Sequence, residues 1–153
     1  MDSLGESDLA DIFTRYKPNF LVEFGTGEGA AAAIAAQFPF DHIYSTEPSH
    51  RLAIQAAFRH STNQLMTFLH GRPERTWREI VREIPAGKTV LFLLGADRLA
   101  AELSLLAGSR DLSRDVFIVA AEEANLERLI GASHSVAPLG ASRGLVYAAP
   151  RRF

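Results

Sequence analysis

Residues 20–38 of the chain are FLVEFGTGEGAAAAIAAQF, an apolar run that leads through closely spaced glycines into an alanine-rich segment. The pattern predicts a buried strand over 20–24 and a helix over 30–37. Three glycines separate them: Gly25, Gly27 and Gly29. Glycine permits a positive φ and leaves no Cβ between the backbone and a ligand, and a helix start directs free N–H groups at the same place. We therefore expect a nucleotide-binding turn after the first strand of an α/β sheet.

The rest of the chain alternates between strand and helix patterns. Six further strands are predicted, over His42–Ser45, Gln64–Leu69, Thr89–Leu94, Asp115–Ala121, His134–Pro138 and Gly144–Ala149. Five further helices are predicted, over Ser7–Tyr16, Pro48–His60, Thr76–Ile84, Arg98–Ala107 and Ala124–Ile130. Such alternation is typical of a parallel sheet with right-handed crossovers and helices on both faces. The last two strands have no helix between them, only a hairpin-like connection over 139–143, so the sheet should end with an antiparallel strand.

Composition excludes several classes of protein. The chain has 153 residues and no linker pattern, which predicts a single domain over 1–153. Its net charge of −2 provides no basic field for nucleic acid or an anionic membrane, so neither is an expected partner. The absence of cysteine excludes disulfides and thiolate metal sites and fits a reducing cytoplasm. No stretch approaches the ~20 apolar residues of a transmembrane helix, and the N-terminus lacks a signal-peptide pattern.

The glycine turn fits two cofactors. Gly25-x-Gly27-x-x-Ala30 satisfies the dinucleotide fingerprint, which tolerates alanine at its third position. The acidic Glu23 before the glycines is typical instead of enzymes that use S-adenosylmethionine (SAM), because a carboxylate would repel a pyrophosphate and attract the ammonium group of SAM. The closing hairpin also replaces the second βαβ half that the dinucleotide fold would require. The balance favours SAM over NAD.

Glu47 follows the second predicted strand and lies 18 residues after Gly29. A carboxylate in this place can accept hydrogen bonds from both hydroxyls of a ribose. Because NAD and SAM both carry a ribose, Glu47 supports a nucleoside ligand without choosing between the two.

The chain resembles the class I SAM-dependent methyltransferases, most closely the branch that methylates oxygen on small molecules. The resemblance is carried by LVEFGTGEGA, IYSTEPS, FLHGRPE, VLFLLGADR and DVFIVAAEE, in this order and at the family's spacing. It implies a Rossmann-like, doubly wound sheet of seven strands, mostly parallel with an antiparallel last strand. It also implies SAM as the cofactor.

The resemblance assigns a set of SAM-contacting residues: Glu23, Gly25, Thr26, Gly27, Gly29, Glu47, Pro48, Gly71, Arg72 and Pro73. The first five would surround the methionine part, Glu47 the ribose, Pro48 the adenine, and the last three the edge of the adenine. The family usually places an acceptor for the adenine amino group at this edge. Arg72 has no acceptor on its side chain, so backbone or Glu74 would take that role.

Candidate catalytic residues follow the later strands. Asp97, Glu122 and His70 could each accept a proton from the methyl acceptor, and His134 is a further histidine near the late strands. Metal-dependent relatives carry a carboxylate where this chain has Gly95. Asp97, Glu122 and Glu123 could still hold a hard cation, but we favour the alternative that they cap the helices that follow them, and we assign no metal site.

Three functions remain open on the sequence. The leading one is methyl transfer to a small-molecule acceptor, with oxygen as the expected acceptor atom. The second is a SAM-binding domain that does not catalyse, and the third is an NAD-binding domain. Only one helix precedes residue 20, whereas related enzymes carry more structure to cover the substrate. We therefore expect a second subunit to cover the cleft, in a homodimer.

Overall fold

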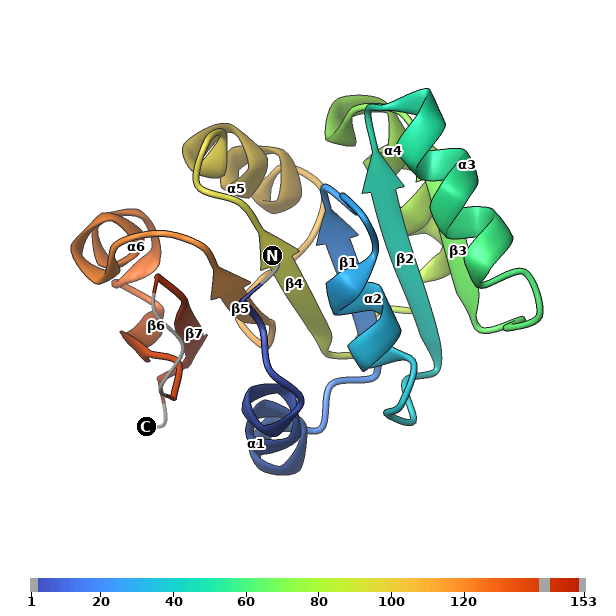
Figure 1. Ribbon diagram of the computed structural model, residues 1–153. Helices are drawn as coiled ribbons and strands as arrows, with labels where there is room; N and C mark the ends of the chain where they lie inside the picture. The colour runs from blue at the N-terminus through green and yellow to red at the C-terminus, as the bar shows by residue number, and fades with distance from the viewer. Residues whose placement is uncertain (1–2, 141–143, 152–153) are drawn as a thin grey trace.

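A seven-stranded sheet organises the chain in the computed structural model, which describes residues 3–140 and 144–151. The strands are β1 (Phe20–Phe24), β2 (His42–Glu47), β3 (Met66–His70), β4 (Val90–Leu94), β5 (Val116–Val119), β6 (His134–Pro138) and β7 (Val146–Pro150). Their order across the sheet is β3-β2-β1-β4-β5-β7-β6 (Figure 1). β1 to β5 are parallel, and β7 is antiparallel to both β5 and β6. The doubly wound fold predicted from the sequence is confirmed.

Helices cover both faces of the sheet. They are α1 (Glu6–Tyr16), α2 (Ala30–Ala35), α3 (His50–Arg59), α4 (Pro73–Glu83), α5 (Leu99–Ala107) and α6 (Glu123–Ile130). α4, α5 and α6 bury their apolar residues against one face, and α1 and α2 bury theirs against the other. α3 packs against β2 and β3 (Figure 1). None of the helices among the described residues has the length and apolar character required to span a bilayer.

The strand order reverses between β1 and β4, and this reversal places the candidate site. β1 is followed along the chain by β2 on one side, whereas β4 pairs with its other side. In sheets of this kind ligands bind beyond the carboxyl ends of the strands at the reversal. β1 and β4 are buried along their whole length, as the continuous apolar sequence of β4 predicts, and β1 buries Glu23 together with its apolar residues.

Some predicted boundaries and caps are wrong. α1 begins at Glu6, one residue before the predicted start at Ser7, with Gly5 as its N-cap, and the Asp8 carboxylate accepts from the Gly5 N–H at 3.3 Å. α4 begins three residues earlier than predicted, because Pro73 occupies its first position, where a proline costs no hydrogen bond. The antiparallel pairing of β6 and β7 confirms the predicted hairpin, but residues 141–143 of its connection lie outside the described residues.

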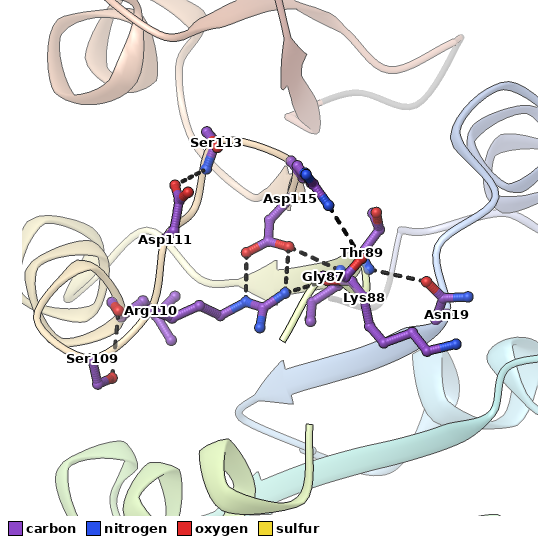
Figure 2. Close-up of polar contacts among 12 residues, drawn as sticks. Asn19, Gly87, Lys88, Thr89, Ser109, Arg110, Asp111, Ser113 and Asp115 are labelled. Carbon is purple, nitrogen blue, oxygen red and sulfur yellow. Dashed lines mark hydrogen bonds and ion pairs between the residues drawn. The ribbon is translucent and has the colours of Figure 1, made fainter. Parts of the chain in front are cut away.

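A buried ion pair ties β4 to β5 at the amino edge of the sheet (Figure 2). The Arg110 guanidinium donates through Nε to Asp115 Oδ2 at 2.8 Å and through Nη2 to Asp115 Oδ1 at 3.0 Å. Asp115 Oδ1 also accepts from the Val90 N–H at 2.9 Å, and Arg110 donates to the Lys88 carbonyl. The Asp115 side chain is fully buried. This clamp fixes the position of β4 relative to β5.

His134 belongs to this amino edge rather than to the cleft. Its Nε2 lies 2.9 Å from the Asp115 carbonyl oxygen, and its ring packs edge-on against Phe117. Burial lowers the pKa of His134, which favours the neutral ring. His134, the further histidine considered as a proton acceptor, therefore does not face the cleft, since β6 runs parallel to β5 and begins at the opposite end of the sheet.

Candidate nucleotide site

The glycine turn adopts a backbone that other residues rarely take. The φ angles of Gly25, Gly27 and Gly29 are +94°, +56° and +87°. A Cβ built on Gly25 or Gly27 would have no described atom within 4 Å, so the turn faces open space. The turn is held from the side of β2, where the Thr46 carbonyl accepts from the N–H groups of Gly25 and Thr26. The glycines therefore leave room at the end of β1 for a ligand to approach the backbone.

A chain of hydroxyl groups connects the turn to the buried carboxylate of Glu23. The Ser45 hydroxyl donates to Glu23 Oε1 at 2.7 Å, and it lies 2.5 Å from the Thr26 hydroxyl. Glu23 is only 1% exposed and Thr26 only 4%. Because Ser45 uses its proton on Glu23, Thr26 donates to Ser45. Glu23 thus places its carboxyl group beneath the turn, not among the residues that line the pocket.

Glu47 is oriented by two backbone N–H groups. Its Oε1 accepts from the Gly27 N–H at 2.9 Å and its Oε2 from the Ser49 N–H at 2.7 Å. The side chain is 8% exposed. Each carboxylate oxygen retains a second acceptor position, so Glu47 can still receive ribose hydroxyls while the same bonds hold it in place.

A pocket of about 490 Å³ opens at the carboxyl ends of β1 and β4, between the starts of α4 and α5. Residues singled out from the sequence contribute Gly25, Pro48, Arg72, Pro73 and Asp97 to its lining. The remaining lining residues are Phe24, Leu93, Leu94, Gly95, Arg98 and Glu102. The pocket therefore combines apolar walls with charged groups, as nucleoside sites commonly do.

An ion pair connects the two helices that border the pocket. Arg98, just before α5, donates to the carboxylate of Glu74 in α4, and both side chains are about half exposed. The contact lowers the pKa of Glu74 and raises that of Arg98. Glu74 was the side-chain alternative for receiving an adenine amino group, and its carboxylate is here occupied by Arg98.

Glu102, like Arg98, is a charged residue of this pocket that the sequence analysis missed. It lies on α5 and is 8% exposed, and its Oε2 is buried without a hydrogen-bond partner among the described residues. Burial raises the pKa of Glu102 to about 7, Arg98 opposes this rise, and Glu74 and Asp97 add to it. A signal was present in the sequence, because Glu102 falls on the same helical face as Leu99, Leu103 and Leu106.

The raised pKa of Glu102 predicts a specific loss of stability with pH. The pKa of this carboxyl group is about 7 in the folded protein and about 4.5 in the unfolded chain. Such a group contributes to the stability of the fold at low pH, and this contribution is lost as the pH rises. We expect the free energy of unfolding to fall by about 2 kcal/mol between pH 5 and pH 7 through this group alone. Denaturant titrations of wild type and Glu102→Gln at several pH values measure it, since the amide cannot titrate. Equal pH slopes in the two proteins would contradict the prediction.

The three candidate catalytic residues lie in different places. Asp97 is exposed and lines the pocket. His70 is exposed at the end of β3, with its Nε2 3.1 Å from the Pro48 carbonyl oxygen and its ring beside His50. Glu122 is exposed at the start of α6 and is not among the pocket residues. The fold therefore brings Asp97, but not the other two, to the pocket.

The structure also bears on whether Asp97, Glu122 and Glu123 cap helices or bind a metal. The N-cap of α5 is Arg98, not Asp97, and no side-chain cap bond forms there among the described residues. Glu122 does occupy the N-cap position of α6, again without a side-chain bond within the described part of the chain. No group of three or more His, Asp or Glu residues suited to a metal occurs among residues 3–140 and 144–151, so Asp97, Glu122 and Glu123 are not gathered into a cation site.

Comparison with known proteins bears on the fold. No protein-family model and no curated protein sequence matches the chain. Solved structures do: a Staphylococcus aureus protein assigned as a caffeoyl-CoA O-methyltransferase superposes with a TM-score of 0.72 at 9% identity, over 95% of this chain and 82% of that one. An rRNA methylase from Streptococcus thermophilus superposes with a TM-score of 0.60 at 13% identity, over 96% and 94%. The chain has the Rossmann-like methyltransferase fold.

The same fold carries more than one chemistry. A precorrin-8w decarboxylase from Methanobacterium thermoautotrophicum superposes with a TM-score of 0.61 at 16% identity, over 94% of this chain and 87% of that one. Fold alone does not determine function, which depends on the residues of the site. The activity of this protein therefore depends on its own turn and pocket.

Proposed function

We propose that the protein is a SAM-dependent methyltransferase that acts on the oxygen of a small molecule. The observation that carries this proposal is the turn after β1, where Gly25 and Gly27, both with positive φ, leave open space beside the oriented carboxylate of Glu47. This turn meets the pocket at the reversal of strand order, where α/β sheets bind nucleotides.

The residues present fit the parts of SAM. Gly25 and Gly27 leave room for the methionine part to approach the backbone, with the carboxyl group of Glu23 below the turn. Glu47 is poised for the ribose, and the apolar side of the pocket, which includes Pro48 and Pro73, suits a flat base. A pyrophosphate, by contrast, would bring two negative charges to a turn that already has Glu23 and Glu47 beside it. These features of the site favour SAM over NAD.

When bound, SAM supplies a sulfonium methyl group whose transfer breaks one C–S bond, forms one C–O bond and leaves a neutral thioether. The acceptor oxygen must lose its proton, and Asp97 is the candidate catalytic residue that lines the pocket. We propose Asp97 as the group that receives this proton. Otherwise the role of the chain is to hold the two reactants in line, which is the larger part of such catalysis.

A small-molecule acceptor is favoured over RNA by the charge of the chain. A protein that binds RNA needs a basic surface to neutralise phosphates, whereas this chain carries a net charge of −2. Among the solved structures with this fold, the Staphylococcus protein is described as a caffeoyl-CoA O-methyltransferase and the Streptococcus protein as an rRNA methylase. The negative net charge of this chain supports a small-molecule acceptor instead of RNA.

Calorimetric titration of the purified chain with SAM, S-adenosylhomocysteine and NAD tests the proposal. We expect SAM and S-adenosylhomocysteine to bind and NAD not to bind. Binding of NAD in place of SAM would assign a dinucleotide function, and binding of none would overturn the cofactor assignment. SAM binding without methyl transfer to any of a panel of phenols and carboxylic acids would favour the non-catalytic alternative.

A further inference from the structure

Glu102 is a buried acid without an evident structural purpose. It occupies the apolar face of α5, where the neighbouring buried positions are leucines, and its Oε2 finds no partner among the atoms of residues 3–140 and 144–151. A buried polar group without a hydrogen bond is costly, and native proteins retain few of them. Glu102 also lines the pocket at the end of β1 and β4. A group that is costly to the fold and borders a pocket is a candidate for contact with a ligand.

The neighbouring charges leave Glu102 available for a ligand. Two positive groups lie at the pocket: Arg98 is engaged by Glu74, and Arg72 is exposed at the start of α4. Asp97, in the loop before α5, adds a second negative charge near Glu102. Desolvation together with these two carboxylates favours the protonated form of Glu102, with Arg98 acting in the opposite direction. Near neutral pH the side chain is therefore present as both acid and carboxylate.

A protonated carboxyl group resembles an amide in its hydrogen bonds. It offers one O–H donor and one carbonyl acceptor side by side. Adenine offers the complement, an amino donor that lies beside a ring-nitrogen acceptor on either side, N1 or N7. Asn and Gln use the amino group and N7 in this way when they bind adenine through two hydrogen bonds in DNA. An ionised carboxylate could receive the amino group but would face the lone pair of the ring nitrogen.

We propose that Glu102, in its protonated form, recognises the adenine ring of the cofactor from α5, donating to a ring nitrogen and accepting from the amino group. This inference rests on the proposed SAM-binding function and names the residue that sets its specificity for the base. It also supplies the acceptor that Arg72 lacks and that Glu74 does not offer while it is paired with Arg98. The recognising group then lies in the helix after β4 instead of in the loop after β3.

The test compares two ligands that differ only at the proposed contact. S-adenosylhomocysteine and its analogue with an unsubstituted purine, which lacks the amino group, are titrated calorimetrically into wild type, Glu102→Gln and Glu102→Leu between pH 6 and pH 8. Leucine matches the apolar face of α5, so Glu102→Leu should fold at least as stably as wild type at pH 8, as a melting curve will show.

We expect wild type to prefer adenine over the purine analogue by about tenfold at pH 6, and to bind adenine more weakly as the pH rises through 7. Glu102→Gln should retain the preference without its pH dependence, and Glu102→Leu should bind both ligands equally. An undiminished preference in Glu102→Leu, or an unchanged pH profile in Glu102→Gln, would overturn the inference while the SAM site stands. Failure of wild type to bind S-adenosylhomocysteine would overturn both proposals.

Discussion

Replacement of Arg110 with alanine is expected to lower the free energy of unfolding by about 3–5 kcal/mol. This is the usual effect of removing one partner of a buried ion pair, because the other charge remains buried and unpaired. Arg110 makes two hydrogen bonds to Asp115, whose side chain is fully buried. In the variant, Asp115 would lose both bonds from Arg110 and keep the hydrogen bond from the Val90 N–H. Urea denaturation measures the change, and the melting temperature should fall by on the order of 10 °C.

Two further variants identify the cause of that loss. Arg114 is exposed and makes one long hydrogen bond, of 3.4 Å, to the Gly87 carbonyl. Arg114→Ala should therefore change stability by no more than about 0.5 kcal/mol. Adding Asp115→Asn to Arg110→Ala removes the buried charge and keeps an acceptor for the Val90 N–H, so it should recover much of the loss. If the double variant is no more stable than Arg110→Ala, the unpaired charge is not the reason.

The sheet was predictable because its central strands have a clear sequence pattern. β1, β4 and β5 are short apolar runs buried on both faces, and each is followed by a helix pattern, which leaves few topologies. The hairpin of β6 and β7 followed from two strand patterns without a helix between them. These features depend on many residues at once, so a wrong interpretation of one residue would not change the predicted fold.

Helix caps were less predictable because each depends on one or two local bonds. Ser7 has the residue type of a cap, yet α1 begins earlier, with the Asp8 carboxylate receiving the Gly5 N–H. Asp97 also has the type, but α5 begins one residue later and Arg98 takes the cap position. Residue type alone does not fix a helix start, since a shift of one residue exchanges the roles of neighbours.

The site was predictable where it depends on backbone and not where it depends on burial. Glu47 and the glycines that follow β1 could be identified in sequence because their spacing is set by the turn itself. Glu102 could not be assigned to the pocket, because its role depends on how α5 packs against the sheet and α4. The role of Ser45 likewise depends on burial, since its hydroxyl lies between Thr26 and Glu23.

Replacement of Gly25 with leucine is expected to weaken SAM binding at least about 100-fold, or by about 2.7 kcal/mol. Gly25 lines the pocket, and a Cβ built on it would point into open space with no described atom within 4 Å. The new side chain would therefore occupy the space where the ligand approaches the end of β1, without clashing with the protein. Calorimetric titration with S-adenosylhomocysteine measures the loss.

Backbone strain is the competing explanation, and Gly87 separates the two. The φ of Gly25 is +94° and that of Gly87 is +85°, so leucine at either position should cost the fold roughly 1–2 kcal/mol. Gly87 lies in the turn before β4, at the amino edge, and its Cβ would meet Arg114 at an ordinary 3.8 Å. Gly87→Leu should then lose as much stability as Gly25→Leu but bind S-adenosylhomocysteine like wild type. Equal loss of binding in both variants would show that strain, not occupation of the turn, is responsible, and the ligand would have to lie elsewhere.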